Sequence, residues 1–486
     1  MSQTNLHRAT KAVHTVPPLC VDLDGTLIAT NTLHETLIAV AGNPVVLASL
    51  PRWLMAGKAV LKRELARRAS LDPTLLPYNQ PLLEYLRREK ASGRYLVLAT
   101  AADRSLAEAV QTHLGLFDEI IASDGVRNLR GKTKAQVLAE RFREQGFAYA
   151  GSDRTDLPIW RQATRAVLVN TSSRVARAAA TAVSVEAELH TRAALLPACI
   201  KALRPYQWIK NLLVFIPLIT AHALDDARGW RSALLLFAAF CTIASGLYLV
   251  NDLSDLAADR HHPYKRYRPF AQGTLPLISG VMLVPILCLL SLGLATMSGA
   301  TWAIVLYAGA STAYSFRLKQ WPLIDLFTLA GLYTIRLFAG GEASGYRVSM
   351  WLLAFSSFFF FSLAVIKLIK RVSELMAVQA RDEKAVPRRA YVVSDLQILQ
   401  LMGVSATFVS VLVLALYVQS EAIRYTRPTL LWLIVPLMLF WQCRLWFATA
   451  RGNMHDDPIT YTAKDWISWL SGIVLVAILT LAAAPL

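Results

Sequence analysis

The sequence is poor in cysteine and in charged residues. Only five of its 486 residues are cysteine, and Cys20, Cys199, Cys241, Cys288 and Cys443 are scattered without close pairs. This spacing excludes a disulfide framework and a cysteine-rich zinc site, and it leaves packing as the expected role. Charged residues make up only 17% of the chain, against 55% hydrophobic residues and a mean hydropathy of +0.40. A chain this apolar and this long is not an ordinary soluble domain, so we expect a membrane protein with more than one domain.

Acidic residues are also scarce relative to basic ones. The 50 Lys and Arg outnumber the 33 Asp and Glu, which gives a formal net charge of +17. In a membrane protein such an excess is typical of cytoplasmic loops and of phosphate-bearing ligands, and we favour this reading over nucleic-acid binding. The first eighteen residues lack the apolar core of a signal peptide, so we expect the N-terminus to stay in the cytoplasm.

The pattern of hydrophobic residues changes near residue 195. From residue 19 to about 190, β-like runs alternate with segments of helical period such as "TKAQVLAERFREQ"; the runs are "LCVDLD", "RYLVLAT", "FAYAG" and "AVLVN". This rhythm predicts a parallel sheet flanked by helices. We therefore expect an α/β domain over residues 1–190, a linker over 191–203 and a membrane domain over 204–486.

Long apolar blocks follow the linker, and each is close to the roughly 20 residues that span a bilayer. They predict an all-α membrane domain of about nine transmembrane helices, near residues 210–225, 231–250, 278–298, 301–316, 322–341, 349–369, 398–418, 428–447 and 467–485.

The charges between these blocks predict the orientation. Loops after the odd-numbered blocks hold five Lys and Arg, namely Arg228, Arg231, Arg347, Arg424 and Arg427. Loops after the even-numbered blocks hold 15, namely Arg260, Lys265, Arg266, Arg268, Arg317, Lys319, Lys370, Arg371, Arg381, Lys384, Arg388, Arg389, Arg444, Arg451 and Lys464. The positive-inside bias places this richer set in the cytoplasm, on the same side as the α/β domain. The expected location is the plasma (inner) membrane.

Two carboxylates follow the first strand. In "CVDLDGTL", Asp22 and Asp24 stand at a strand end in a turn opened by Gly25. Acids two residues apart point the same way, so they can share a Mg²⁺ while one attacks phosphorus. Acid pairs of this kind also occur in plain turns.

These residues resemble the haloacid dehalogenase superfamily over roughly residues 15–190. Thr100 ends "YLVLAT", Lys134 opens a helix in "GKTKAQVL", and "GSDRTD" follows "FAYA". The resemblance implies a Rossmann-like fold with a helical cap over residues 32–90. It also implies Asp22 as nucleophile, Asp24 as general acid/base, and Thr100 and Lys134 as phosphate ligands.

The last motif departs from the family. Ser152 stands directly after Gly151, where the family usually has Asp, so Asp153 or Asp156 would have to complete the metal site. A regulatory or scaffolding domain without turnover is the alternative.

Three aspartates follow the second apolar block in "NDLSDLAAD". Asp252, Asp255 and Asp259 are three and four residues apart, which stacks them on one face of a helix. Acids near a bilayer are costly without compensation, and Mg²⁺ bound to a diphosphate supplies it. Ordinary solvated acids on an interfacial helix are the competing reading.

This segment resembles the first aspartate-rich motif of the UbiA-type intramembrane prenyltransferase superfamily, over residues 200–486. The second aspartate cluster of aromatic prenyltransferases is missing. Together with "LRPYQWIKNLLVF", "DRHHPYKRYRPFAQG" and "YSFRLKQWPLIDLFTLAGLYTIRLFAGG", the motif looks most like the decaprenyl-phosphate phosphoribosyltransferase branch. The branch implies transfer of a 5-phosphoribosyl group from phosphoribosyl diphosphate to a polyprenyl phosphate.

Both of those substrates are multiply anionic, and candidate cations gather on one membrane face. The predicted substrate-binding residues of the membrane half are Arg204, Lys210, Asn211, Asn251, Lys265, Arg266, Arg268, Tyr314, Lys319, Asp325 and Arg336. Arg336 lies inside an apolar block, where an unpaired guanidinium is not tolerated. Arg317 and Lys370 fit a role in topology equally well, and we assign them none in binding.

The sequence thus predicts a Mg²⁺-dependent transferase in the bilayer, acting on phosphoribosyl diphosphate and a polyprenyl phosphate without nucleic acid. The metal ligands would be Asp252, Asp255 and Asp259 in the membrane half, and Asp22, Asp24, Asp153 and Asp156 in the α/β half. The fused domain would remove the 5-phosphate of the lipid product. The alternatives are prenyl transfer to an aromatic or tetrapyrrole acceptor, a phosphatase on a silent anchor, and a lipid transporter.

Overall fold

The computed structural model describes residues 16–191, 194–379, 391, 394–421, 425–454 and 457–483. The chain divides into two compact units. The first is Met1–Ala202 with Val250–Met282, and the second is Leu203–Leu249 with Leu283–Leu486. The segment with the three aspartates therefore belongs to the same unit as the α/β fold.

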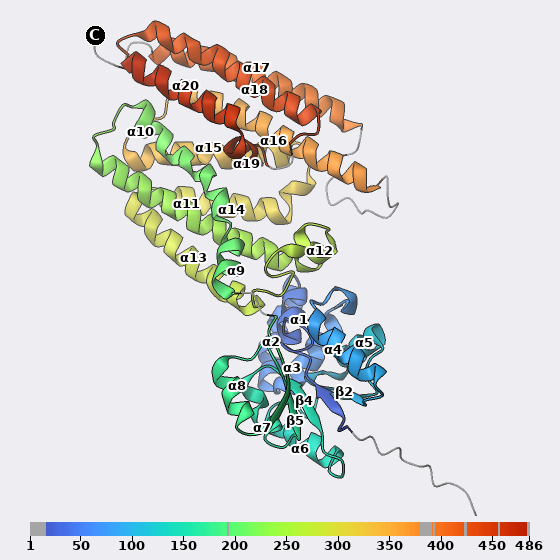
Figure 1. The fold of residues 1–486 in the computed structure, drawn as a ribbon. Coiled ribbons are helices and arrows are strands. Elements are labelled where there is room, and N and C mark those ends of the chain that lie inside the picture. The colour runs from blue at the N-terminus through green and yellow to red at the C-terminus, as the bar shows by residue number, and fades with distance from the viewer. Residues whose placement is uncertain are drawn as a thin grey trace, which may run out of the picture. The chain divides into compact units, whose positions relative to one another are not determined.

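A six-stranded parallel sheet forms the core of the first unit (Figure 1). Its strands are β1 (Leu19–Val21), β2 (Leu96–Asp103), β3 (Glu119–Ser123), β4 (Ala148–Gly151), β5 (Arg165–Val169) and β6 (Ser184–Leu189), in the order β3-β2-β1-β4-β5-β6. Successive residues of β1 point to opposite faces, so Leu19 and Val21 join one apolar cluster and Cys20 joins another. The predicted parallel α/β fold is confirmed.

Helices cover the sheet and fill the stretch predicted to form a cap. The first unit contains α1 (Thr32–Val40), α2 (Pro44–Met55), α3 (Lys58–Arg68), η1 (Pro73–Leu75), α4 (Gln80–Ala91), α5 (Arg104–Leu114), α6 (Lys132–Arg141), η2 (Arg154–Asp156), α7 (Leu157–Trp160), α8 (Ser173–Ala180), α9 (Leu195–Leu203), α12 (Leu256–His261) and η4 (Lys265–Tyr267). Asparagine side chains cap three of these helices, because Asn31, Asn43 and Asn79 accept hydrogen bonds from the first-turn N–H groups of α1, α2 and α4. The predicted helical character of residues 32–90 is thus confirmed.

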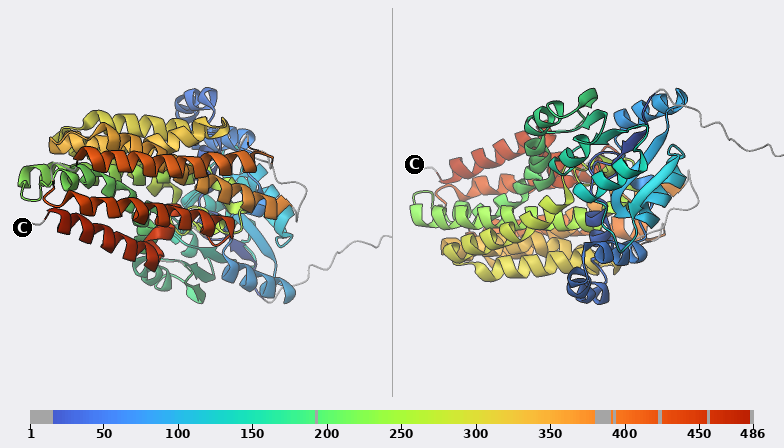
Figure 2. Two further views of the ribbon diagram at one scale, coloured as in Figure 1. Left: turned by 90° about the horizontal axis from the view of Figure 1, so that it is seen from above. Right: turned by 90° about the horizontal axis from the view of Figure 1, so that it is seen from below.

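The second unit is a bundle of long apolar helices that lie side by side in Figures 1 and 2. Its elements are η3 (Pro205–Phe215), α10 (Ile216–Thr220), α14 (Thr301–Phe316), η5 (Leu318–Gln320), α15 (Ile324–Ser344), α16 (Met350–Gln379), α17 (Asp395–Glu421), η7 (Pro428–Leu433), α18 (Ile434–Ala450), α19 (Pro458–Lys464) and α20 (Trp466–Ala483). Two long helices have residues in both units, α11 (Ala227–Ser254) and α13 (Leu277–Ser298), and the last residue of α9, Leu203, also belongs to the second unit.

Within the described residues, six helical segments are long and apolar enough to cross a membrane. They are Ala227–Ser254, Leu277–Ser298, Met350–Lys370, Asp395–Ser420, Pro428–Ala450 and Trp466–Ala483, and they match six of the predicted blocks. The other three predicted blocks are not among these six helices, each for its own reason. The first is divided into η3 and α10, α14 has only 16 residues, and α15 carries Asp325, Arg336 and Glu342. The total of nine spans stays a prediction. Five of the cations that predict its orientation, Arg381, Lys384, Arg388, Arg389 and Arg424, lie outside the described residues.

Candidate functional site

A small polar pocket of about 130 Å³ opens at the carboxyl ends of β1 and β4. It is lined by Asp22, Asp24, Asn31, Leu33, Lys62, Ala101, Arg130, Gly131, Lys134, Asp153, Thr155 and Asp156. Every acid predicted for the α/β half is among them. The parallel topology explains this convergence, because the ends of neighbouring parallel strands meet at one edge of the sheet.

A chain of hydrogen bonds fixes the predicted nucleophile. Lys134, at the start of α6, donates from Nζ to Asp22 Oδ1 at 2.7 Å and to the Tyr149 hydroxyl at 3.0 Å. Tyr149 in turn donates to Asp156 Oδ1 at 3.1 Å. Lys134 is buried, and its ammonium balances the charge of Asp22. The pocket can therefore hold a carboxylate and an anionic group together.

Asp24 is held by the first turn of α1. The Thr32 N–H donates to Asp24 Oδ1 at 2.7 Å, and the Thr32 hydroxyl donates to Oδ2 at 3.2 Å. Burial and the nearby Asp22 carboxylate raise the pKa of Asp24 above its ordinary value. A carboxyl group that keeps its proton more readily is suited to act as a general acid.

The loop after β4 surrounds the side chain of Asp156. Asp156 is buried, and its Oδ2 accepts from the Ser152 and Asp153 N–H groups at 3.0 and 3.1 Å. Burial and Asp22 raise the pKa of Asp156 to about 6. The oxygen ligands available at this pocket suit Mg²⁺ chemically. In the described part of the chain, however, no three acidic, histidine or cysteine side chains converge as a metal site, so these four acids remain predicted ligands.

The pocket also contains two cations that sequence reasoning missed, Lys62 and Arg130. Lys62 donates to the Ala101 carbonyl at 2.6 Å, and burial lowers its pKa. Lys62 reaches the pocket from α3. This helix contains several basic residues, and the sequence does not distinguish Lys62 from the others. Thr100 is fully buried and accepts from the Ala102 N–H at 3.0 Å, so its neighbour Ala101 is the residue that lines the pocket.

The second acidic site lies where α11 ends. Asp252 and Asp259 are both buried, and one guanidinium bridges them, since Arg268 Nη1 lies 3.0 Å from Asp252 Oδ1 and 2.6 Å from Asp259 Oδ2. Asp255 stands between α11 and α12, yet its N–H still bonds to the Asn251 carbonyl and its carbonyl accepts from Asp259. The helical spacing thus persists, and two acids already share a cation. Carboxylate oxygens suit Mg²⁺ chemically. These three acids do not converge as a metal site among the described residues either, so they too remain predicted ligands.

A buried ion pair fixes the same segment within the first unit. Both terminal nitrogens of Arg260 bond to Glu35 of α1, at 2.7 and 3.0 Å, and Arg260 Nε donates to the Ala271 carbonyl. Arg260 directly follows Asp259, and Glu35 is one turn from Thr32. From the sequence, Arg260 counts only among the loop cations that predict the membrane orientation. The residues around it give no indication of a partner 225 residues away in the chain.

In the second unit, Arg336 is buried, and each of its three guanidinium nitrogens has a hydrogen-bond partner. Its Nε donates to Asn211 Oδ1 at 2.7 Å, its Nη2 donates to the Tyr307 hydroxyl at 2.9 Å, and its Nη1 contacts the Leu332 carbonyl. The guanidinium also stacks over the Tyr307 ring at 4.5 Å. The structure thus brings together Arg336 and Asn211, which the sequence singled out separately.

Lys210 lies beside an acid that the sequence left without a role. Asp457 caps α19, and its Oδ2 lies 3.2 Å from Lys210 Nζ and 2.8 Å from Lys367 Nζ. Although burial opposes the shift, these two ammonium groups lower the pKa of Asp457. Lys210 and Arg336 also lie over the same Tyr333 ring, at 5.8 and 5.7 Å.

The remaining predicted residues are spread over several elements. Asp325 is fully buried at the start of α15 and accepts from the Tyr391 hydroxyl at 2.6 Å. The Arg204 guanidinium lies over the Tyr248 ring, and that of Arg266 lies over Tyr267. Asn251 and Tyr314 are half-buried near the ends of α11 and α14, Lys265 is exposed in η4, and Lys319 is half-buried in η5.

Comparison with known proteins identifies the family. The model of the UbiA prenyltransferase family matches residues 212–467. An uncharacterized protein of Sinorhizobium fredii, y4nM, is 35% identical over 474 residues, which cover 96% of this chain and 91% of that protein. The decaprenyl-phosphate phosphoribosyltransferase of Corynebacterium glutamicum is 40% identical over 165 residues, covering 33% of this chain and half of that enzyme.

Solved structures resemble each half separately. A UbiA homolog from Archaeoglobus fulgidus bound to GPP and Mg²⁺ aligns with 58% of this chain and 99% of its own, at a TM-score of 0.45 and 17% identity. A haloacid dehalogenase family hydrolase from Salmonella enterica aligns with 36% of this chain and 68% of its own, at a TM-score of 0.27 and 14% identity. With more than half of its residues matched by the family model and a relative similar over nearly its whole length, the chain belongs to the UbiA prenyltransferase family.

Proposed function

We propose that the membrane half transfers a 5-phosphoribosyl group from phosphoribosyl diphosphate to a polyprenyl phosphate. The observation that carries the proposal is the pair of buried carboxylates, Asp252 and Asp259, joined by one guanidinium. A relative that shares 165 aligned residues bears the name decaprenyl-phosphate phosphoribosyltransferase. Both substrates are anionic, and the described membrane half contains two buried cations, Lys210 and Arg336.

In this proposal Asp252, Asp255 and Asp259 would hold Mg²⁺, which when bound neutralises the negative charge of a departing diphosphate. Arg268, already within hydrogen-bond distance of two of these acids, can donate to the same phosphate oxygens. Asn251, one residue before the first acid, would orient the ligands at the edge of the site. As the bond from ribose C1 to the diphosphate breaks, an oxygen of the acceptor phosphate forms the new bond to C1. That oxygen is already ionised, so no strong general base is needed.

The cations of the second unit would bind the other phosphate groups. Arg336 is oriented by Asn211 and Tyr307, so its planar guanidinium is held ready without having to be ordered on binding. Lys210 is positioned by Asp457. Asp325, oriented by Tyr391, is an acceptor suited to ribose hydroxyls.

We further propose that the α/β half removes the 5-phosphate of the lipid-linked product. Asp22 Oδ attacks phosphorus, the phosphorus–oxygen ester bond breaks, and Asp24 donates its proton to the leaving ribose oxygen. Water then hydrolyses the aspartyl phosphate and releases inorganic phosphate. The Lys134 ammonium at 2.7 Å from Asp22 supports this role because it offsets the charge of phosphate and carboxylate together.

The transferase proposal is tested with the purified full-length protein, Mg²⁺, polyprenyl phosphate and radiolabelled phosphoribosyl diphosphate. Labelled lipid is expected from the wild type, and Asp252→Asn is expected to lose at least about a hundredfold of the rate. Asp225→Asn, an equal loss of charge in an exposed turn, is the matched control. Transfer from a radiolabelled prenyl diphosphate to an aromatic acceptor, with none from phosphoribosyl diphosphate, would contradict the proposal.

The phosphatase proposal has its own readout. Phosphate released from the phosphoribosyl lipid is compared between the wild type, Asp22→Asn and Glu140→Gln, an exposed neutralisation on α6. Asp22→Asn is expected to abolish release while transfer continues. Equal release by all three proteins would overturn it.

A further inference from the structure

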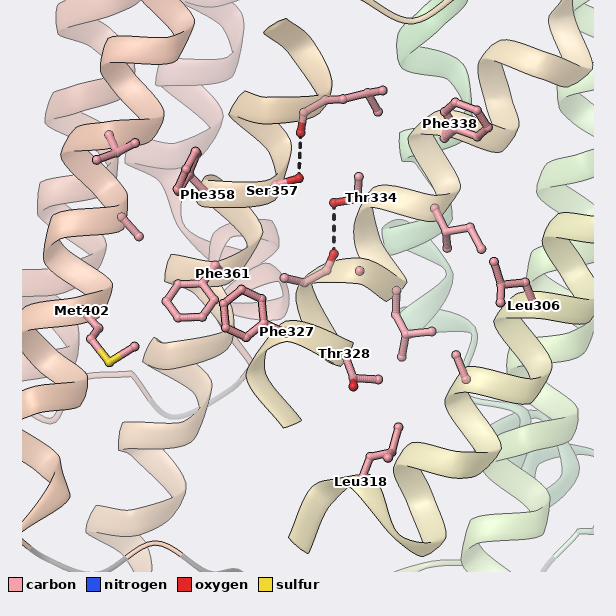
Figure 3. Close-up of a pocket in the computed structure, with 18 of the residues that line it drawn as sticks. Leu306, Leu318, Phe327, Thr328, Thr334, Phe338, Ser357, Phe358, Phe361 and Met402 are labelled. Atoms are coloured by element: carbon pink, nitrogen blue, oxygen red, sulfur yellow. Dashed lines mark hydrogen bonds between the residues drawn. The ribbon is translucent and has the colours of Figure 1, made fainter. Parts of the chain in front are cut away.

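A long apolar groove lies on the second unit, between α14, α15, α16 and α17. Its cavity volume is about 1070 Å³, and it is lined by hydrophobic side chains of all four helices. In Figure 3, Leu318 and Phe338 lie near opposite ends, with Phe361 and Met402 on the far wall. The groove is distinct from the Arg336 cluster, because Thr334 and Phe338 line it while Arg336 lies on another face of the same helix.

The walls offer few polar groups to a ligand, because three of the four hydroxyl side chains that line the groove bond within their own helices and Ser405 is the fourth. Thr328 donates to the Ile324 carbonyl at 2.6 Å, Thr334 donates to Ala330 at 3.1 Å, and Ser357 donates to Leu353 at 2.9 Å. Figure 3 shows the last two bonds as dashed lines. The ligand part inside the groove must therefore be hydrocarbon.

Small residues create the space. Gly331 of α15 and Ala310 of α14 line the groove, as do the buried Ala330 and Ala406. A Cβ added at Gly331 would meet no atom within 4 Å. The side of the groove is open, since Leu306, Phe327 and other lining residues are exposed, so a chain can enter from the bilayer.

Charge distinguishes one end of the groove from the other. Leu318 at the first end stands between Arg317 and Lys319, and neither cation forms an ion pair with any residue that the structure describes. At the other end, Trp302 donates to the carboxylate of Glu342, so an acid stands there. Lipid tails are as apolar as the groove walls, so hydrocarbon contact alone gives little selectivity within a membrane. The cations at one end therefore select the ligand.

We infer that this groove binds polyprenyl phosphate, with its isoprenoid chain along α15 and its phosphate at Arg317 and Lys319. The inference rests on the proposed function and assigns its lipid acceptor a second, non-catalytic site. From Phe327 to Phe338, α15 rises by about 16 Å, roughly half the hydrocarbon core of a bilayer. One continuous groove with Arg317 and Lys319 at one end and an acid at the other suits one long chain with a terminal anion better than a two-chained phospholipid.

The test uses full-length protein in nanodiscs of phosphatidylcholine and a polyprenyl phosphate with a photoreactive diazirine in its chain. Adducts located by mass spectrometry are expected in peptides of α15, α16 and α17. Gly331→Phe fills the groove and is expected to reduce them about tenfold or more, whereas Gly309→Phe on α14 adds the same side chain outside the groove and leaves them unchanged. Ala310→Phe, at a lining position on α14, must repeat the loss, and Arg317→Gln must weaken labelling.

Competition identifies the ligand. Unlabelled polyprenyl phosphate is expected to remove the adducts, and phosphatidylglycerol at the same concentration is not. Equal displacement by both lipids, adducts unaffected by Gly331→Phe, or adducts only between two copies of the chain would each overturn the inference. Asp252→Asn is expected to abolish transfer and keep the groove labelled. Labelling without any transfer by the wild type would therefore refute the proposed function alone.

Discussion

At the scale of single residues, Asp156 makes the stability of the α/β fold depend on pH. Its pKa rises from 3.8 to about 6 on folding. Between these two values the folded chain holds a proton on Asp156 that the unfolded chain releases. The contribution of this group to the free energy of unfolding is therefore complete below pH 3.8 and is lost as the pH rises toward 6. A shift of this size corresponds to roughly 3 kcal/mol. In thermal unfolding with EDTA, we expect the wild type to lose stability relative to Asp156→Asn over this window, because the amide cannot ionise. A constant difference would contradict the assignment.

Arg336 depends on its neighbours because its charge is buried in the helix bundle. Asn211→Leu removes the acceptor of its Nε and leaves a buried guanidinium partly unpaired. We expect a loss of about 3 kcal/mol or more, measured as a lower thermal midpoint in detergent. Ser344→Ala on the same helix removes only a hydroxyl that bonds to its own backbone, so it should change the midpoint far less. Equal effects would show that the guanidinium is not the cause.

A residue's place in a functional site could be predicted where its sequence neighbours form a recognisable motif, and could not be predicted where they do not. Asp22, Asp24 and Lys134 stand at strand and helix ends within recognisable motifs, and the structure places all three around one pocket. Lys62 reaches the same pocket from a helix whose other basic residues look alike in sequence. Asp457 has no local signal of this kind, since only the fold brings Lys210 and Lys367 to it.

At the scale of elements, the pair of Glu35 and Arg260 joins α1 to the last turn of α12. Both side chains are buried and bonded through two nitrogens. Each single alanine substitution is expected to cost about 3–5 kcal/mol because it leaves a buried charge, and the double substitution should cost less than their sum. A double-mutant cycle of unfolding free energies measures this coupling. Strict additivity would show that the two residues act independently.

Elements were easiest to predict where their apolar pattern was complete. The strands β1, β2, β4 and β5 are continuous buried runs, while β3 and β6 were missed because both contain glutamates and β6 is half-exposed at the sheet edge. In the membrane half, α15 was recognised despite Asp325 and Arg336, since the rest of the block is apolar. The division of the first block into η3 and α10 has no such signal, because its prolines also fit the start of a helix.

At the scale of the whole molecule, the predicted orientation places the loop after α11 in the cytoplasm and the turn before it outside. Tyr264 and Leu224 are exposed in these two segments. After replacement of the five native cysteines, Tyr264→Cys should react with an impermeant maleimide only in inside-out vesicles, and Leu224→Cys only in intact cells or spheroplasts. Labelling of both from one side would refute the orientation.

The position of Arg260 in the chain also affects how the protein is made. The α/β fold ends at Ala202, but the arginine that neutralises Glu35 is about 60 residues further on, beyond α11. At translation rates of about 5–20 residues per second, the ribosome needs roughly 3–12 s to reach it. During this interval the nascent domain carries an uncompensated carboxylate on α1. Its maturation must therefore wait until the helix preceding Arg260 has been delivered to the bilayer.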